Sequence, residues 1–314
     1  MELYEANRIL RSVKAAAAAD GFKLPAAAET DGLLMLLDKI DAEKHIAKLV
    51  TRTLEKTHTP ATRDRAINLI AFFSALDAVR RGLHEKPSVS MLCALNNELY
   101  EGTAVSGKLR SVTAATGGSA HTDPKYISGS LRSITAKMDE IVGAPTTAKE
   151  DFAVYLSHYM RELVILRPFE VGSEFTVRIF IIMFCRQKGF ALDYFRSTPH
   201  AIKSAEGDAF ITDDVTPLYT LFSSCLAYDY KAASPTQSPP TRKDEKKKPQ
   251  KKPAQSESKS DKAASDEPLS DDKIIIRAVR LQQKISKLNE QLTELMKPLE
   301  DKNTGQNYTE EDDD

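Results

Sequence analysis

The sequence contains no tryptophan and only three cysteines in its 314 residues. Cys93, Cys185 and Cys225 form no CxxC pair, which argues against both a disulfide framework and a zinc site. The longest uninterrupted apolar run, Ile179–Cys185, is far too short to span a membrane. The first residues, Met1–Glu5, lack the basic and then apolar order of a secretory signal. We therefore expect a cytoplasmic protein without membrane contact.

The charge balance is close to neutral, with 44 basic and 45 acidic residues and a net charge of −1. This excludes a nucleic-acid binder that is basic along its whole length. Residues 231–270 contain one large apolar residue, Leu269, so we expect them to be a disordered linker. Within this linker, residues 241–253 carry seven basic and two acidic side chains. They could contact nucleic acid or an acidic partner, or serve only as a solvated spacer.

Residues 271–300 have the clearest periodicity in the chain. Their apolar residues are spaced alternately by four and three positions: Ile274, Ala278, Leu281, Ile285, Leu288, Leu292, Leu295 and Leu299. This pattern predicts a coiled-coil helix that makes the protein a homo-oligomer or binds a partner helix. Packing of this helix back onto the rest of the protein is the alternative. Residues 301–314 predict an acidic disordered tail.

The first 230 residues are predicted to be mostly helical. Apolar residues at i, i+3 and i+4 spacing predict helices over Lys44–Leu54, Ala61–Gly82, Ser88–Tyr100, Pro124–Val142, Ala148–Leu166 and Phe175–Gly189. Lys108–Ala120 is the exception, because Thr116-Gly117-Gly118 within it is typical of a hairpin turn. We expect an all-α domain of six or seven helices with one short β-hairpin. We divide this part into an N-terminal helical region (1–60) and a core domain (61–230).

The segment with the most specific pattern is RPFEVGSEFTVR, residues 167–178, which lies between two hydrophobic helices. It resembles the motif HPFx[DE]GNGRxxR of the Fic/Doc (Fido) family. Leu92–Ile127 is similar to the family's segment leading into a flap hairpin, and Gly189–Phe195 is similar to the segment after the second core helix. The resemblance covers roughly residues 45–200 and implies the helical Fic/Fido fold with a hairpin flap.

The resemblance also implies a reaction, in which AMP is transferred from ATP onto a protein hydroxyl while a magnesium ion is held between the phosphates. The family's catalytic base is a histidine, but Arg167 stands in its place and keeps its proton. The family's acidic metal ligand is replaced by Val171, whose side chain has no oxygen for a hard cation.

The loop that would bind phosphates is only partly kept. Gly172 is retained, Ser173 replaces an asparagine, and Phe175 replaces the first arginine of the pair. Glu174 replaces the second glycine and places a negative charge where phosphate oxygens would lie. The second arginine of the pair is present as Arg178.

These changes predict a Fic-fold protein that has lost AMP transfer and needs neither a cofactor nor a metal. It would act as a scaffold that holds a protein partner in the groove beside the flap or through the coiled coil. The alternative is an active transferase with a rewired site, which moves AMP or another phosphate-containing group onto a protein hydroxyl and uses ATP and Mg²⁺.

A segment before the core is similar to the inhibitory helix of some family members, whose pattern is [ST]xxxE[GN]. Thr51 and Glu55 match this pattern, whereas Lys56 departs from it, and Ser286–Glu290 has the same spacing. The resemblance implies that Glu55 forms an ion pair with Arg178.

Overall fold

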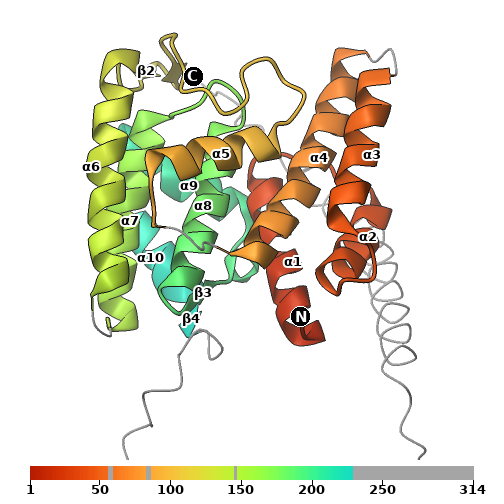
Figure 1. The fold of residues 1–314 in the computed structure, drawn as a ribbon. Coiled ribbons are helices and arrows are strands. Elements are labelled where there is room, and N and C mark those ends of the chain that lie inside the picture. Colours follow the sequence, from red (N-terminus) through yellow and green to blue (C-terminus); the bar gives the residue numbers. More distant parts are fainter. Residues whose placement is uncertain (56–58, 83–85, 145–146, 229–314) are drawn as a thin grey trace, which may run out of the picture. The chain divides into compact units, whose positions relative to one another are not determined.

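Ten α-helices and two pairs of short strands make up the part of the chain that the structure describes (Figure 1). The structure is a computed structural model that describes residues 1–55, 59–82, 86–144 and 147–228, without the side chains of Leu54 and Glu55. The predicted linker, coiled-coil helix and acidic tail lie outside the described residues. The elements are α1 (Leu3–Ala19), α2 (Ala26–Leu36), α3 (Ala42–Glu55), α4 (Pro60–Arg81), α5 (Val89–Leu99), β1 (Ala115–Thr116), β2 (Ser119–Ala120), α6 (Pro124–Gly143), α7 (Lys149–Leu166), α8 (Ser173–Gln187), β3 (Phe190–Leu192), the 3₁₀ turn η1 (Tyr194–Arg196), α9 (Pro199–Ile211), α10 (Thr216–Cys225) and β4 (Leu226–Tyr228).

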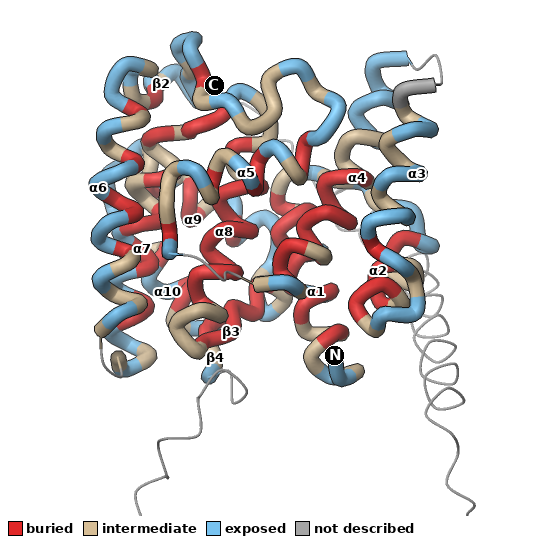
Figure 2. The backbone as a smooth tube through the Cα atoms, viewed as in Figure 1, coloured by how far each residue is buried: buried red, intermediate tan, exposed pale blue. Residues whose placement is uncertain are grey.

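The helix α8 forms the centre of the bundle. Every residue from Phe175 to Cys185 is buried (Figure 2), as expected for a helix that is apolar on almost all sides. It packs against α1, α4, α5 and α7. Because the motif loop precedes α8 directly, the core holds that loop in a defined position.

Local capping signals explain where several helices begin. The side chains of Thr59, Ser88, Asp123 and Thr198 each accept a hydrogen bond from a backbone N–H in the first turn of α4, α5, α6 and α9, respectively. Such caps satisfy donors that have no partner within the helix. In three of these helices a proline follows the cap, where its missing N–H costs nothing.

The mainly helical fold class is confirmed, but the predicted number of helices is too low. The six helices predicted with residue ranges correspond to α3–α8, whereas α1, α2, α9 and α10 were not predicted. The buried face of α1 combines four alanines with Ile9, Leu10 and Val13, an apolar pattern that sequence reasoning missed. Because α1 packs against α4, α8 and α9, the first helix of the chain is part of the core.

The short hairpin β1–β2 lies within the segment predicted to be extended. Ala115 pairs with Ala120 and Thr116 with Ser119, and Gly117 and Gly118 at the turn both have positive φ, as hairpin turns require. The antiparallel pair β3–β4 was not predicted, because three-residue strands carry too little periodicity. Within the described ranges, no helix is both long enough and apolar enough to cross a membrane.

Candidate functional site

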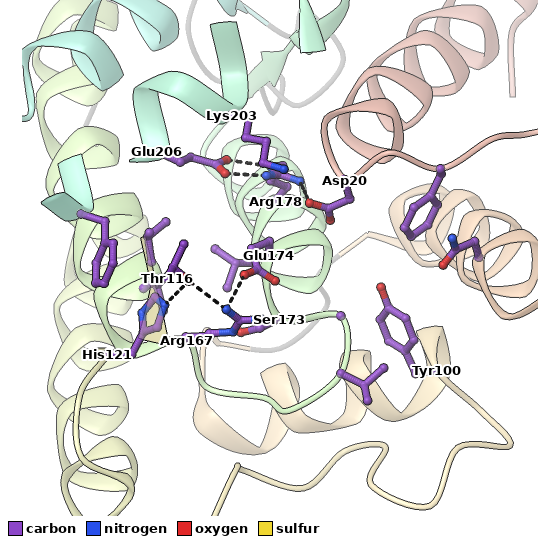
Figure 3. Close-up of a pocket in the computed structure, with 18 of the residues that line it drawn as sticks. Asp20, Tyr100, Thr116, His121, Arg167, Ser173, Glu174, Arg178, Lys203 and Glu206 are labelled. Atoms are coloured by element: carbon purple, nitrogen blue, oxygen red, sulfur yellow. Dashed lines mark hydrogen bonds and ion pairs between the residues drawn. The ribbon is translucent and has the colours of Figure 1, made fainter. Parts of the chain in front are cut away.

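A cavity of about 730 Å³ opens at the loop between α7 and α8 (Figure 3). Its walls come from that loop, the flap hairpin β1–β2, the turn after α1, and the helices α4 and α9. The predicted site residues Arg167, Val171, Gly172, Ser173, Glu174 and Arg178 all line it. The structure thus brings together every site residue of the motif.

The loop has two residues in the left-handed backbone region. Arg167 ends α7 with φ 41° and ψ 68° and precedes Pro168, which disfavours a helical residue before it. Gly172 precedes α8 with φ 63°. A Cβ atom there would lie 1.8 Å from the ring of Tyr100, so this position accepts only glycine.

Arg110, which sequence reasoning missed, holds this loop against the flap. Its side chain is buried, with 4% of the residue exposed. Nε donates to the carbonyl of Arg167 at 2.8 Å, Nη2 to that of Leu166 at 3.0 Å, and Nη1 to that of Val112 at 2.8 Å. The first two carbonyls end α7, where a cation is favourable. Burial and the charge of Arg167 lower the pKa of Arg110, but an arginine remains protonated.

Asn96 is a second missed residue, and its only signal is that it is a polar residue at a core position of α5. It is buried, and Nδ2 donates to the carbonyl of Val171 at 3.1 Å and to Oγ1 of Thr176 at 3.0 Å. Its Oδ1 accepts from the N–H of Gly107 at 2.8 Å. Asn96 therefore holds the loop at Val171, the residue that stands at the family's metal-ligand position, by a hydrogen bond to its carbonyl.

Arg178 is held between two carboxylates, with 1% of the residue exposed. Nε donates to Oε1 of Glu206 at 2.7 Å, and Nη1 lies 2.7 Å from Oδ1 of Asp20 (Figure 3). Desolvation raises the pKa of both carboxyl groups, an effect that attraction to Arg178 opposes. The two carboxylates in turn raise the pKa of Arg178 well above its usual value, against the effect of burial.

The partners found for Arg178 differ from the predicted one. Glu206 comes from α9 and Asp20 from the end of α1, two helices that the periodicity did not predict. The side chain of Glu55 lies outside the described part of the chain, so its pairing with Arg178 remains a prediction. On α9, a single helical face with i, i+3 and i+7 spacing brings Lys203, Glu206 and Phe210 to the cavity.

The other motif residues also line the cavity. Nη1 of Arg167 donates to Oγ1 of Thr116 at 3.1 Å and lies 3.4 Å from a carboxylate oxygen of Glu174. Ser173 accepts a hydrogen bond on Oγ from the N–H of Phe169 at 3.3 Å, which supports the loop. The position predicted for the catalytic base therefore carries a guanidinium that is already paired.

His121 follows the flap hairpin and also lines the cavity. Its ring stacks on Phe210 with centroids 4.2 Å apart, and its nitrogen atoms contact Oγ1 of Thr116 and the carbonyl of Ile165. Burial is the largest cause that lowers the pKa of His121, followed by the charge of Arg167. The imidazole is therefore neutral near pH 7.

Comparison with known proteins links this site to one family. Residues 86–185 match the Fic/DOC family. The "Probable protein adenylyltransferase Fic" of Salmonella typhimurium (strain LT2) is 30% identical over 104 residues, which cover 33% of this chain and 52% of that protein. The chain thus spans about half the length of this curated relative.

One solved structure of a Fic domain shows a similar fold. The N-terminal Fic domain of a VirB-translocated Bep effector protein from Bartonella quintana, with bound ADP, has a TM-score of 0.51 and 13% identity, over 57% of this chain and 91% of that one. The N-terminal Fic domain of Bep8 from Bartonella sp. 1-1C has a TM-score of 0.49 and 16% identity, over 58% and 92%. At 13% identity, the similarity to the Bartonella quintana domain concerns the fold alone.

Proposed function

Residues 86–185 of this chain belong to the Fic/DOC family, and on this premise we propose that the protein has lost AMP transfer and serves as a non-catalytic scaffold for a protein partner. The fold is related to that of adenylyltransferases. Whether the chemistry is kept depends on the groups that face the cavity.

The observation that carries the proposal is the charge around the cavity. Four carboxylates line it, namely Asp20, Asp64, Glu174 and Glu206, against the three cations Arg167, Arg178 and Lys203. Both arginines already have carboxylate neighbours. A nucleoside triphosphate is strongly anionic, so its phosphates would meet more negative than positive charge here. Such a lining opposes the binding of ATP.

The residues at the positions of the base and the metal ligand also oppose AMP transfer. Arg167 keeps its proton and is no base. Val171 offers no side-chain oxygen to Mg²⁺, and its carbonyl accepts from Asn96. Among the residues that the structure describes, no cluster of three or more histidine, cysteine, aspartate or glutamate side chains could hold a metal. The residues at the family's metal position therefore do not fit a magnesium ion.

The test is to measure nucleotide binding and transfer with the full-length protein. We expect calorimetry to detect no ATP binding at millimolar Mg²⁺, and no transfer of label from ATP, CTP, GTP or UTP to the chain or to lysate proteins. Micromolar affinity that depends on the metal, or labelled protein, would contradict the proposal and favour a rewired transferase.

A variant with a restored loop serves as the positive control. It carries Arg167→His, Val171→Glu, Ser173→Asn and Glu174→Gly. It is expected to regain ATP binding before turnover and only with Mg²⁺, because Val171→Glu supplies an oxygen ligand for a metal ion whose charge offsets the carboxylates of the cavity. Phe175 is left unchanged, because it is fully buried and its ring lies 4.8 Å from that of Phe22. An arginine there would bury an unpaired charge.

The scaffold function includes association, for which we propose the heptad segment of residues 271–300. Light scattering should give an oligomer for the full chain and a monomer for a chain that ends at residue 235. Equal masses per chain would instead favour packing of this segment onto the core.

The groove beside the flap is the proposed site for the protein partner. Salt-dependent binding of RNA or DNA that requires residues 241–253 would add nucleic acid as a partner.

A further inference from the structure

Two side chains of the flap form a hydroxyl–imidazole pair that the proposed scaffold function does not use. Oγ1 of Thr116 lies 2.8 Å from Nε2 of His121, and both residues line the cavity (Figure 3). The backbone N–H of His121 donates to the carbonyl of Ala114 at 2.9 Å, which continues the pairing of the hairpin and holds the pair in register.

The surroundings of His121 determine which nitrogen atom carries its proton. Nδ1 lies 3.3 Å from the carbonyl oxygen of Ile165, and a carbonyl can only accept a hydrogen bond. The proton of the neutral ring is therefore on Nδ1, which leaves Nε2 free to accept the proton of the Thr116 hydroxyl. With the ring stacked on Phe210, this is the arrangement of an activated nucleophile: a hydroxyl, a base and a group that orients the base.

Arg167 supplies a positive charge beside the same hydroxyl. Its Nη1 donates to Oγ1 of Thr116 at 3.1 Å, so the hydroxyl accepts from the guanidinium while it donates to His121. A fixed cation at this distance stabilises negative charge that develops on an oxygen atom during a reaction. Thr116 is exposed and therefore accessible to a ligand in the cavity.

The charged groups that face His121 come from three elements. Arg167 at the end of α7 and Arg110 before the flap lower its pKa, and Glu174 at the start of α8 raises it. Burial acts in the same direction as the arginines and is the largest cause. The ring is therefore in the neutral form that a base requires near pH 7.

The cavity lining indicates which electrophile would fit. Leu163, Val164, Val177 and Phe210 give it apolar walls on the sides formed by α7, α8 and α9. The excess of carboxylates over cations disfavours a phosphate group, whereas an uncharged carbonyl carries no such penalty. The ligand class that fits both features is an ester or thioester of an apolar carboxylic acid.

We propose that Thr116 and His121 act as nucleophile and base, and that Thr116 accepts an acyl group from such an ester. Oγ1 of Thr116 forms a bond to the carbonyl carbon, and its proton moves to Nε2 of His121. The bond from that carbon to the donor's oxygen or sulfur atom then breaks, and His121 returns the proton to the departing alcohol or thiol. The product is an ester on Thr116, formed without an oxidant or reductant, and it does not depend on ATP binding.

The test uses p-nitrophenyl acetate with the full-length protein. Nitrophenolate release follows the rate, and intact-mass and peptide analysis locate the acetyl group. We expect one acetyl group on Thr116, removable by alkaline hydroxylamine as an oxygen ester is, whereas acetyl-lysine amides resist. The variant Thr116→Val should abolish this modification and Thr116→Ser should retain it, while Thr113→Val, at another exposed flap position, should leave it unchanged.

The base is tested through the pH dependence, which a merely structural contact would not change. Wild-type acetylation of Thr116 should rise with pH through the pKa of His121. In His121→Asn this step should be absent and the rate lower by about 100-fold or more, as expected for loss of a general base. Acetylation confined to lysine, or a wild-type rate and pH profile equal to those of His121→Asn, would overturn the proposal. Circular dichroism spectra that match the wild type show that each variant is folded.

Discussion

The substitution Glu206→Gln tests how strongly the cavity depends on the cluster Asp20–Arg178–Glu206. The exposed fraction of Glu206 is 5% and that of Arg178 is 1%, so water cannot replace the lost carboxylate. The amide keeps the size of the side chain, and Arg178 retains Asp20 as a counter-charge. Removing one partner of a buried ion pair costs about 3–5 kcal/mol. Because Asp20 remains, we expect the lower end, about 3 kcal/mol.

The matched control is Glu29→Gln, which makes the same change in an ion pair at the surface. Glu29 lies 2.5 Å from Lys14, and both side chains are partly exposed, by 31% and 46%. Such pairs contribute about 0.2–1 kcal/mol. For a domain of this size, about 1 kcal/mol shifts the Tm by about 2–4 °C. Thermal unfolding followed by circular dichroism should therefore show a loss of about 6–12 °C for Glu206→Gln and only about 0.4–4 °C for the control.

A double-mutant cycle separates this cluster from other effects of the substitution. Arg178→Met leaves two carboxylates facing each other without a cation, so it should destabilise the fold strongly. Adding Glu206→Gln to Arg178→Met should then recover part of that loss, because one of the two buried charges is removed. If Glu206→Gln alone costs no more than Glu29→Gln, the cluster does not hold α9 to the core and our reasoning fails.

Two further predictions concern the motif loop and the flap. Gly172→Ala should lower the free energy of unfolding by at least about 2 kcal/mol in urea titrations, because a Cβ at positive φ would meet the ring of Tyr100. The control is Gly129→Ala, on the exposed side of α6, which should raise the free energy of unfolding by about 0.5–1 kcal/mol. Burial and the charge of Arg167 lower the pKa of His121, so the unfolded chain binds its proton at a higher pH than the folded one. The stabilisation by the neutral ring is present above the unfolded pKa of about 6.5 and is lost as the pH falls from there through the lower pKa of the folded state. Wild type should thus lose stability relative to His121→Asn between about pH 7.5 and pH 5, and parallel pH profiles of the two proteins would contradict this assignment.

Much of this protein is determined by local sequence. The helices α3–α8 follow from apolar spacing and from caps such as Thr59 and Ser88, because both signals act within a few residues. The identity of the motif residues is equally local. The sequence alone says that Arg167 cannot act as a base and that Val171 cannot hold Mg²⁺ with its side chain.

The tertiary structure decided which groups meet at the cavity. Arg178 reaches Asp20 and Glu206 because α1 and α9 pack together beside α8. The apolar face of α1 shows that this helix is partly buried, but it does not say which helices cover it. The same holds for the flap. Thr116 and His121 are neighbours in sequence, but the carbonyl of Ile165 and the ring of Phe210, which orient the imidazole, come from α7 and α9. Periodicity records which face of a helix is buried, and only the packed chain determines what that face contacts.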